Sequence, residues 1–174
     1  FYLYAPYRKQ SHIPIFDTSR MDSNFDNLFN FNDFYGADRQ SNANRLTTAV
    51  TTRLIEDNSG YERFFLSLGQ TQYFTSPRIT LGEAIKKGEN KIRRSALTAE
   101  TGVAITRDLY AKANLDWSTN NKQVIYGTFD LNYRPASDKI FSISYRYNRA
   151  DYVEATKTDQ IDTSFYWSLN NKWA

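Results

Sequence analysis

The stretch that decides the fold is Leu109–Tyr147, which contains LYAKANLDW (109–117), QVIYGTFDLNYR (123–134) and IFSISYRY (140–147). In each run, apolar and polar side chains alternate along the chain. A period of two is typical of β-strands with one apolar and one polar face. Short links rich in turn-forming residues join the runs, at 119–122 and 135–139. The three runs are therefore predicted to form an antiparallel up-and-down meander.

The same alternation predicts further strands on both sides of this stretch. They are RLTTAVTTRLIE (45–56), ERFFLSLGQTQYF (62–74), SALTAETGVAIT (95–106) and IDTSFYWSL (161–169). In the second of these runs the apolar face reaches Gln70 and Gln72, which leaves the register of that strand open. FYLYAPY (1–7) is predicted to be the end of a strand that Pro6 stops.

Two long segments interrupt the strands. Residues 1–44 are rich in Asn, Asp and Ser and contain many phenylalanines, so beyond the strand end we expect a long loop that packs on another surface. Residues 75–94 are predicted to be a second long, basic loop. We accordingly divide one domain, 1–174, into the loop segment 1–44, a hairpin 45–74, the loop 75–94 and a five-strand meander 95–169.

The composition is consistent with strands that cross a membrane. No apolar run of about 18 residues exists, so no transmembrane helix is expected. A membrane strand needs only about 9–11 residues, and half of them are polar. Aromatic residues make up 16% of the chain although its mean hydropathy is only −0.66. An apolar band bordered by aromatic girdles on an otherwise polar surface would give this combination.

The two faces of the predicted meander differ in charge. From Leu97 to Leu169 the apolar face carries no charged residue. The polar face carries Glu100, Lys112, Asp116, Asp130, Arg134, Arg146 and Asp162. The strands run about 10–12 residues, longer than the usual 5–6. We therefore predict part of a transmembrane β-barrel with a polar lumen. Two alternatives stay open, namely a soluble β-sandwich with the apolar face as its core, and a small closed pore of about eight strands.

Loop lengths suggest an orientation for this barrel. Outer-membrane barrels have short turns on the periplasmic side and longer loops outside. The links after the second and sixth strands are long, and most of the others are tight. This parity places Trp117 and Tyr147 near the outer rim, and Tyr133 and Trp167 near the inner one. Tyr and Trp at both ends of an apolar band are typical of membrane interfaces.

The sequence offers no catalytic or metal-binding constellation. Its only histidine is His12 in the first loop segment, and it has no cysteine. Asp33 and Asp38 beside Gly36 do not have the spacing of a calcium loop and are typical of Asx turns. We expect neither enzymatic activity nor a cofactor. The net charge of +3 is scattered along the chain, so we expect no nucleic-acid partner.

The first part of the chain resembles one family, the lipopolysaccharide-assembly outer-membrane protein LptD, also called the organic solvent tolerance protein. The resemblance is to the C-terminal barrel domain of that family and covers residues 2–74. The matching elements are Tyr4-Ala5-Pro6-Tyr7 with Arg8 and Gln10, Ile13-Pro14 with Phe16-Asp17, Leu28-Phe29 with Asn32 and Phe34, Gly36 with Asp38-Arg39, Ala43-Asn44, Thr52-Arg53, Glu62-Arg63, and Gly69-Gln70 with Tyr73-Phe74.

The resemblance implies a large outer-membrane β-barrel preceded by a periplasmic jelly-roll domain. A lipoprotein of the LptE type would plug the lumen. Lipopolysaccharide would arrive from a periplasmic bridge protein and leave through a gap between the first and last strands. This chain would be an interior block of the wall that lacks the jelly roll and both gate strands. The family's cysteine pairs have no counterpart here, so the resemblance places no disulfide on this chain.

The resemblance also suggests which residues meet partners. The apolar face would meet membrane lipid, and the polar face would line the lumen and contact the plug. Residues 8–39 would form a surface loop that folds over the lumen. Its cations would contact lipid A phosphates, since Arg suits them, or would instead pair with nearby acids to order the loop. The candidate contact residues are Arg8, Lys9, Asp17, Asp38, Arg39, Arg53, Lys112, Asp130, Arg134 and Arg146.

Overall fold

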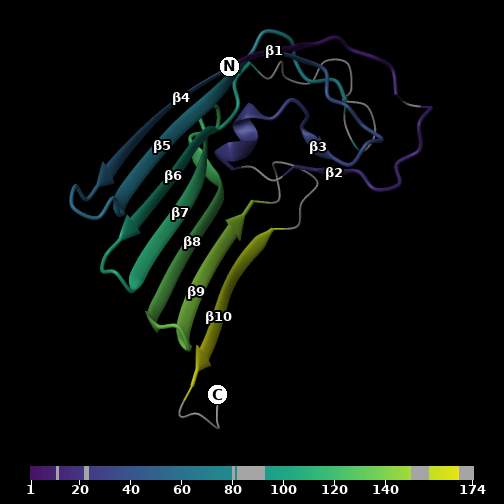
Figure 1. The fold of residues 1–174 in the computed structure, drawn as a ribbon. Helices are drawn as coiled ribbons and strands as arrows, with labels where there is room; N and C mark the ends of the chain where they lie inside the picture. The colour runs from purple at the N-terminus through teal and green to yellow at the C-terminus, as the bar shows by residue number, and fades with distance from the viewer. Residues whose placement is uncertain (11, 22–23, 80, 82–92, 150–156, 169–174) are drawn as a thin grey trace.

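The computed structural model describes residues 1–10, 12–21, 24–79, 81, 93–149 and 157–168. The described part of the chain is all-β, apart from a short 3₁₀ helix, and Figure 1 shows its long strands side by side in one broad sheet. The strands of this sheet are β1 (Tyr2–Ala5), β4 (Ala43–Ile55), β5 (Glu62–Tyr73), β6 (Leu97–Ala104), β7 (Leu109–Ser118), β8 (Gln123–Ala136), β9 (Lys139–Asn148) and β10 (Thr158–Trp167).

The sheet confirms the predicted antiparallel meander. Its strand order is β1-β4-β5-β6-β7-β8-β9-β10, so from β4 onward each strand pairs with the next one in the sequence. Every pair is antiparallel. The described strands form one layer in this sheet, not the two facing layers of a sandwich. The sheet is also open, because β1 and β10 are its two edges.

Three register shifts interrupt the strict alternation. They fall at Leu54/Ile55, at Asp116/Trp117 and between Tyr133 and Ala136. The last of these contains Pro135, which has no N–H to donate and is tolerated in a sheet at such irregularities. β8 therefore continues through Pro135 to Ala136, where a turn was expected. Several expected features lie outside the described residues. They are Leu169, the turn at 170–172, and most of the links between β5 and β6 and between β9 and β10.

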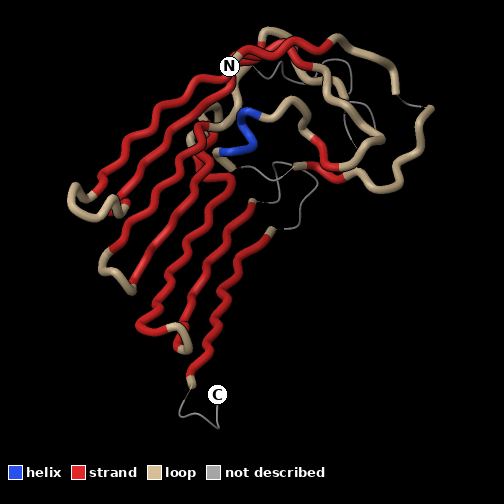
Figure 2. Tube along the Cα trace, viewed as in Figure 1, coloured by secondary structure: helices blue, strands red, loops and turns tan. Residues whose placement is uncertain are grey.

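Links of different length lie at opposite ends of the sheet. The short links 56–61, 105–108 and 137–138 lie at one end, called here the short-link end and seen at the lower left in Figure 2. The links that follow β1, β5 and β9 leave the sheet at the other end, called here the long-link end, where the short turn 119–122 also lies.

The described residues between 6 and 42 form a lobe beside the long-link end (Figure 1). The lobe contains the 3₁₀ helix η1 (Asp26–Phe29) and a two-stranded ribbon of β2 (Ser19–Arg20) and β3 (Phe34–Tyr35). It packs against the polar face of the sheet, where Leu28 of η1 lies over Gly69 of β5. A β-carbon at Gly69 would lie 2.7 Å from Leu28 Cδ1, so the absence of a side chain there allows the lobe to approach the sheet.

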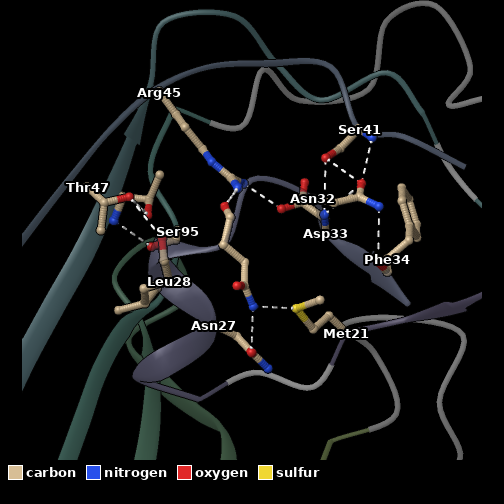
Figure 3. Close-up of polar contacts among 12 residues, drawn as sticks. Met21, Asn27, Leu28, Asn32, Asp33, Phe34, Ser41, Arg45, Thr47 and Ser95 are labelled. Atoms are coloured by element: carbon tan, nitrogen blue, oxygen red, sulfur yellow. Dashed lines mark hydrogen bonds and ion pairs between the residues drawn. The ribbon is translucent and has the colours of Figure 1, made fainter. Parts of the chain in front are cut away.

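Arg45 joins the lobe to β4. Its guanidinium donates to the Asp33 carboxylate, with Nη1 2.5 Å from Oδ1, and to the carbonyl oxygen of Asn30 at 2.7 Å. Figure 3 shows the Arg45 side chain reaching from its strand toward Asp33. Two residues further along β4, the Thr47 hydroxyl donates to the carbonyl of Leu28 at 3.2 Å. Arg45 and Thr47 are both buried, so the lobe and the sheet share a polar interface.

Asn32 ties the two ends of the lobe's last loop together. Its amide nitrogen donates to the carbonyl oxygens of Phe34 and Arg39, each at 3.0 Å. Its amide oxygen accepts from the backbone N–H of Ser41 at 2.9 Å (Figure 3). These contacts fix the path of the chain into β4.

Burial is inverted relative to a soluble sheet protein. Among the described residues, the buried set is mainly polar, namely Arg39, Ser41, Asn42, Arg45, Thr47, Ser67, Thr71, Thr98, Glu100, Asp116 and Ser118. The buried apolar residues are Phe34, Ala43, Ala96, Ala104, Ala111 and Ile125. The large side chains of the apolar face lie outside, with Val50 64% and Phe165 76% exposed. An apolar surface of this width is unfavourable in water, so it indicates an interaction or membrane-facing surface.

We expect Arg45→Met to loosen the lobe without unfolding the sheet. The change leaves the Asp33 carboxylate and the Asn30 carbonyl without their donor, at a cost of about 2 kcal/mol. Hydrogen exchange of lobe peptides in the full-length protein should accelerate roughly 30-fold. Arg53→Met is the matched control, since Arg53 lies on the same strand and face but is exposed in its pair with Glu62. Equal acceleration in both variants would contradict the assigned role of Arg45.

Candidate functional site

The candidate site is the polar face of the sheet together with the lobe that covers one end of it. At its centre lies a group of charged residues on three neighbouring strands. Lys112 of β7 lies opposite Asp130 of β8 in the register, and its ammonium is 2.5 Å from a carboxylate oxygen of Glu100 on β6. The Asp130 carboxylate also accepts a hydrogen bond from the Ser144 hydroxyl at 2.7 Å. The group therefore places one base beside two acids, with Glu100 in an ion pair and Asp130 in a hydrogen bond to a hydroxyl.

Closer to the long-link end, the polar face is buried and hydrogen-bonded. The Thr98 hydroxyl donates to the Asp116 carboxylate at 2.7 Å, and both side chains are almost fully buried. In the neighbouring row, the Asn114 amide donates to the Thr128 hydroxyl at 3.2 Å. A buried carboxylate is costly unless hydrogen bonds stabilise it, so these contacts rigidify the wall.

The remaining polar-face candidates lie apart from the group formed by Lys112, Asp130 and Glu100. Arg53 is near the short-link end, with Nε 3.4 Å from the Glu62 carboxylate. Arg134 is exposed at the same end, where its backbone N–H donates to the carbonyl of Asp108. Arg146 is exposed on β9, opposite Thr128 and Gln160 in the register. The structure thus brings Lys112 and Asp130 together and leaves the three arginines separate from them.

In the lobe, Asp38 organises the backbone of its neighbours. One oxygen of its carboxylate accepts from the backbone N–H groups of Phe16 (2.8 Å) and Asp17 (3.1 Å) and from the Thr18 hydroxyl (3.3 Å). These hydrogen bonds favour the ionised form and lower the pKa of Asp38 from its ordinary value of 3.8. Gly36 turns the chain at this point, with a φ of 82° and no room for a β-carbon beside Asp17.

The cations of the lobe have different environments. Arg8 and Lys9 are exposed. Arg39 is only 8% exposed, and its Nη1 donates to the carbonyl oxygen of Asp38 at 2.8 Å. Within the described part of the chain, the ion pairs are Arg45–Asp33, Arg53–Glu62, Arg63–Glu56 and Lys112–Glu100. None of them joins Arg8, Lys9 or Arg39 to Asp17 or Asp38.

Sequence reasoning missed the residues that attach the lobe. Arg45, Asp33 and Asn32 hold the lobe on the sheet, yet none was a candidate. The signal for Arg45 was an arginine at a position that alternation assigns to the polar face, next to a predicted strand end. Its partner is twelve residues away in an irregular segment, and periodicity carries no information about such a segment.

The described residues of the site make polar and apolar contacts. They include no group of three or more His, Cys, Asp or Glu residues placed to hold a metal ion. No helix in the described part of the chain is long and apolar enough to cross a membrane. The arrangement offers a polar wall, an attached lobe and an apolar outer surface.

Comparison with known proteins gives one family. The family described as "LptD: LPS transport system D" matches residues 1–173. LPS-assembly protein LptD of Thiobacillus denitrificans is 38% identical over 173 residues, which are 99% of this chain and 22% of that protein. The protein of the same name from Cupriavidus necator is 35% identical over 99% of this chain. The one from Xylella fastidiosa Temecula1 is 34% identical over the whole chain.

The chain therefore spans about a fifth of the length of the curated relatives that it matches. The resemblance seen in residues 2–74 extends to nearly the whole sequence, including the meander, where alternation alone carried the likeness. From the family match and the identities, together with the all-β meander, we conclude that the chain belongs to the LptD family.

Proposed function

We propose that this chain is a wall segment of an outer-membrane translocon that assembles lipopolysaccharide into the outer leaflet. Its apolar face meets membrane lipid, its polar face lines the lumen, and its lobe lies inside the barrel near the outer rim. The relatives are named LPS-assembly proteins, and the family is described as a transport system, which is not an enzymatic role. The proposal applies these printed functions to the longer protein of which this chain is a part.

The observation that carries the proposal is the inverted burial of the sheet. The chain covers one end of the polar face with its own lobe, with Arg45 and Thr47 buried in between, and leaves the apolar face outside. A soluble sandwich would bury the apolar face. A barrel wall needs the arrangement seen here, with lipid on one side and a polar lumen on the other. The open edges at β1 and β10 are where further strands of a larger barrel would pair.

Aromatic residues support the membrane orientation. Trp117 lies on β7 near the long-link end, whereas Tyr133 and Trp167 lie near the short-link end, and all three are 38% exposed. The Lys139 ammonium lies 5.3 Å from the centre of the Trp167 ring. An ammonium beside an interfacial tryptophan is typical of the border between apolar core and headgroups. The long links would then face the cell exterior.

The partners follow from the two surfaces. A plug lipoprotein of the LptE type would contact the exposed part of the polar face, where Asp130 and Arg146 lie. Lipopolysaccharide would pass along the lumen, and the exposed Arg8 and Lys9 of the lobe are candidates to contact its phosphates. The buried Arg39 would instead serve the lobe itself. A periplasmic bridge protein would bind a part of the longer protein outside this chain.

Site-directed photocrosslinking in whole cells tests this proposal. A photoreactive residue replaces Asp130 or Arg146 on the polar face of the full-length protein, or Phe129 or Ile143 on the apolar face. Phe129 precedes Asp130 directly and faces the other side, so the two positions share depth and differ only in face. Lys112 is left intact because its ammonium compensates the buried Glu100.

We expect protein adducts with the plug lipoprotein from the polar-face positions only, and lipid adducts from the apolar-face positions. Lipopolysaccharide adducts from the polar face would support its path along the lumen. Protein adducts from Phe129 and Ile143 with none from Asp130 and Arg146 would overturn the assignment of the faces, and with it the lumenal role of the polar face.

The hydrogen bonds of Asp38 predict a pH dependence of the lobe. Because its pKa is lowered on folding, its contribution to stability is complete above the ordinary value of 3.8 and is lost as the pH falls through the lowered pKa. Asp38→Asn removes this contribution at every pH. At neutral pH, exchange of the Phe16 and Asp17 amides in the full-length protein should become several-fold faster in the variant. The difference from wild type should vanish in strong acid.

Asp57→Asn is the control for this measurement, since Asp57 is exposed in the turn at the opposite end of the sheet. Unchanged exchange in Asp38→Asn at neutral pH, or an equal change in Asp57→Asn, would contradict the role assigned to Asp38.

A further inference from the structure

A groove of about 650 Å³ lies on the outward, apolar face of the sheet. Its floor is formed by four small residues on three neighbouring strands, which are Ala99 and Thr101 of β6, Ala113 of β7 and Gly127 of β8. Larger side chains border it, namely Leu115, Phe129, Tyr145 and Tyr147. The lining is mostly apolar, and the volume falls within the range of roughly 300–1,000 Å³ of small-molecule sites.

The register shows that the groove is a local feature of the outward face. One row across the sheet contains Val50, Leu68, Ala99, Leu115 and Gly127 as successive partners. Val50 and Leu68 fill the row on one side with branched side chains. Ala99 and Gly127 then leave hollows on β6 and β8, on either side of Leu115. An ordinary lipid-facing wall has no need for such a hollow.

Neither side-chain packing nor backbone conformation requires glycine at the position of Gly127. A β-carbon at Gly127 would meet only the Asn114 carbonyl oxygen at 3.7 Å and Leu115 Cδ1 at 3.8 Å, which are ordinary contacts. The backbone of Gly127 is not in the left-handed region. The hydroxyl of Thr101 donates to the carbonyl of Phe65 at 2.8 Å, so it needs no partner in the groove. Space for a ligand is therefore available where a side chain could have stood.

Positive charge lies at one end of the groove. Gln123 and Arg149 line its long-link end, and Lys122 is exposed in the adjoining turn. The backbone N–H of Arg149 donates to the carbonyl of Ile125 at 3.0 Å, which extends the pairing of β9 with β8 up to this arginine. The nearby Asp159 carboxylate accepts a hydrogen bond from the Tyr145 hydroxyl. An apolar trough with cations at one end is complementary to an acyl chain with an anionic headgroup.

We propose that this groove binds one acyl chain of a membrane lipid whose phosphate-bearing headgroup has a net negative charge, with the headgroup beside Lys122 and Arg149. The inference rests on the proposed function in one respect, that the apolar face meets lipid. It goes further by assigning a preferred lipid position on the wall, distinct from the lumen. The bound lipid would sit in the leaflet at the long-link end.

The test uses the full-length protein in nanodiscs of phosphatidylethanolamine with a minor fraction of phosphatidylglycerol. A photoreactive residue replaces either Leu115 at the groove or Val50, which lies in the same row away from it, and lipid adducts are identified by mass spectrometry. Gly127→Leu fills the groove, and Thr52→Leu adds the same side chain to the outward face of β4. Lys122→Gln with Arg149→Gln removes the charge at the end of the groove.

We expect phosphatidylglycerol, which lacks the ammonium group of phosphatidylethanolamine, to be enriched at Leu115 over Val50 by roughly tenfold, which corresponds to about 1.4 kcal/mol. Gly127→Leu should abolish the enrichment and Thr52→Leu should leave it intact. The double glutamine variant should lose the preference for phosphatidylglycerol but keep adducts with phosphatidylethanolamine. Equal adducts at Leu115 and Val50 in the unfilled protein would overturn the groove proposal and leave the lipid-facing wall standing. Absence of lipid adducts at both positions would overturn the wall as well.

Discussion

The structure depends on one constraint, that the same strands must satisfy two different environments. Backbone pairing between neighbouring strands runs from β4 to β10 and is interrupted at three register shifts, so the backbone is satisfied mainly within the sheet. The side chains are then free to differ by face. The outward face is mainly apolar over the meander, with charged side chains such as Lys139 and Arg149 near its ends, whereas the inward face contains an ion pair between Lys112 and Glu100.

The lobe uses this inward polarity to attach itself. A lobe held by apolar packing would need a hydrophobic patch on the lumenal side, which would be exposed whenever the lobe moved. Arg45 and Thr47 instead bind backbone carbonyls of Asn30 and Leu28, and Gly69 gives η1 room to approach. Buried hydrogen bonds are directional, so they fix the position of the lobe as well as its attachment. The cost is that removing one partner leaves a buried polar group unsatisfied.

Alternation made the sheet predictable, and the same reasoning explains where prediction stopped. Period two identified both faces of the meander and its antiparallel order, because each strand reports its own faces locally. The bulge at Asp116/Trp117 and the extension of β8 through Pro135 escaped it, since both depend on how two strands match. Alternation did not predict the contacts of Lys112 with Glu100 and of Arg45 with Asp33. These contacts depend on the register of the strands and on the path of the lobe. The motif resemblance in residues 2–74 pointed to the family, yet it did not show that Arg39 is buried.

The outward face follows a weaker rule than the inward one, and this explains why a groove can form there. Side chains on the lumenal face must match their neighbours in charge and hydrogen bonding, so a change at Asp116 affects Thr98 directly. On the lipid face any apolar side chain is tolerated, because fluid acyl chains fill whatever shape remains. A hollow of four small residues therefore costs the wall little packing energy, whereas the same hollow in a soluble core would be a destabilising cavity. Contact with lipid therefore allows small residues at the proposed groove without loss of the fold. These residues are Ala99, Thr101, Ala113 and Gly127.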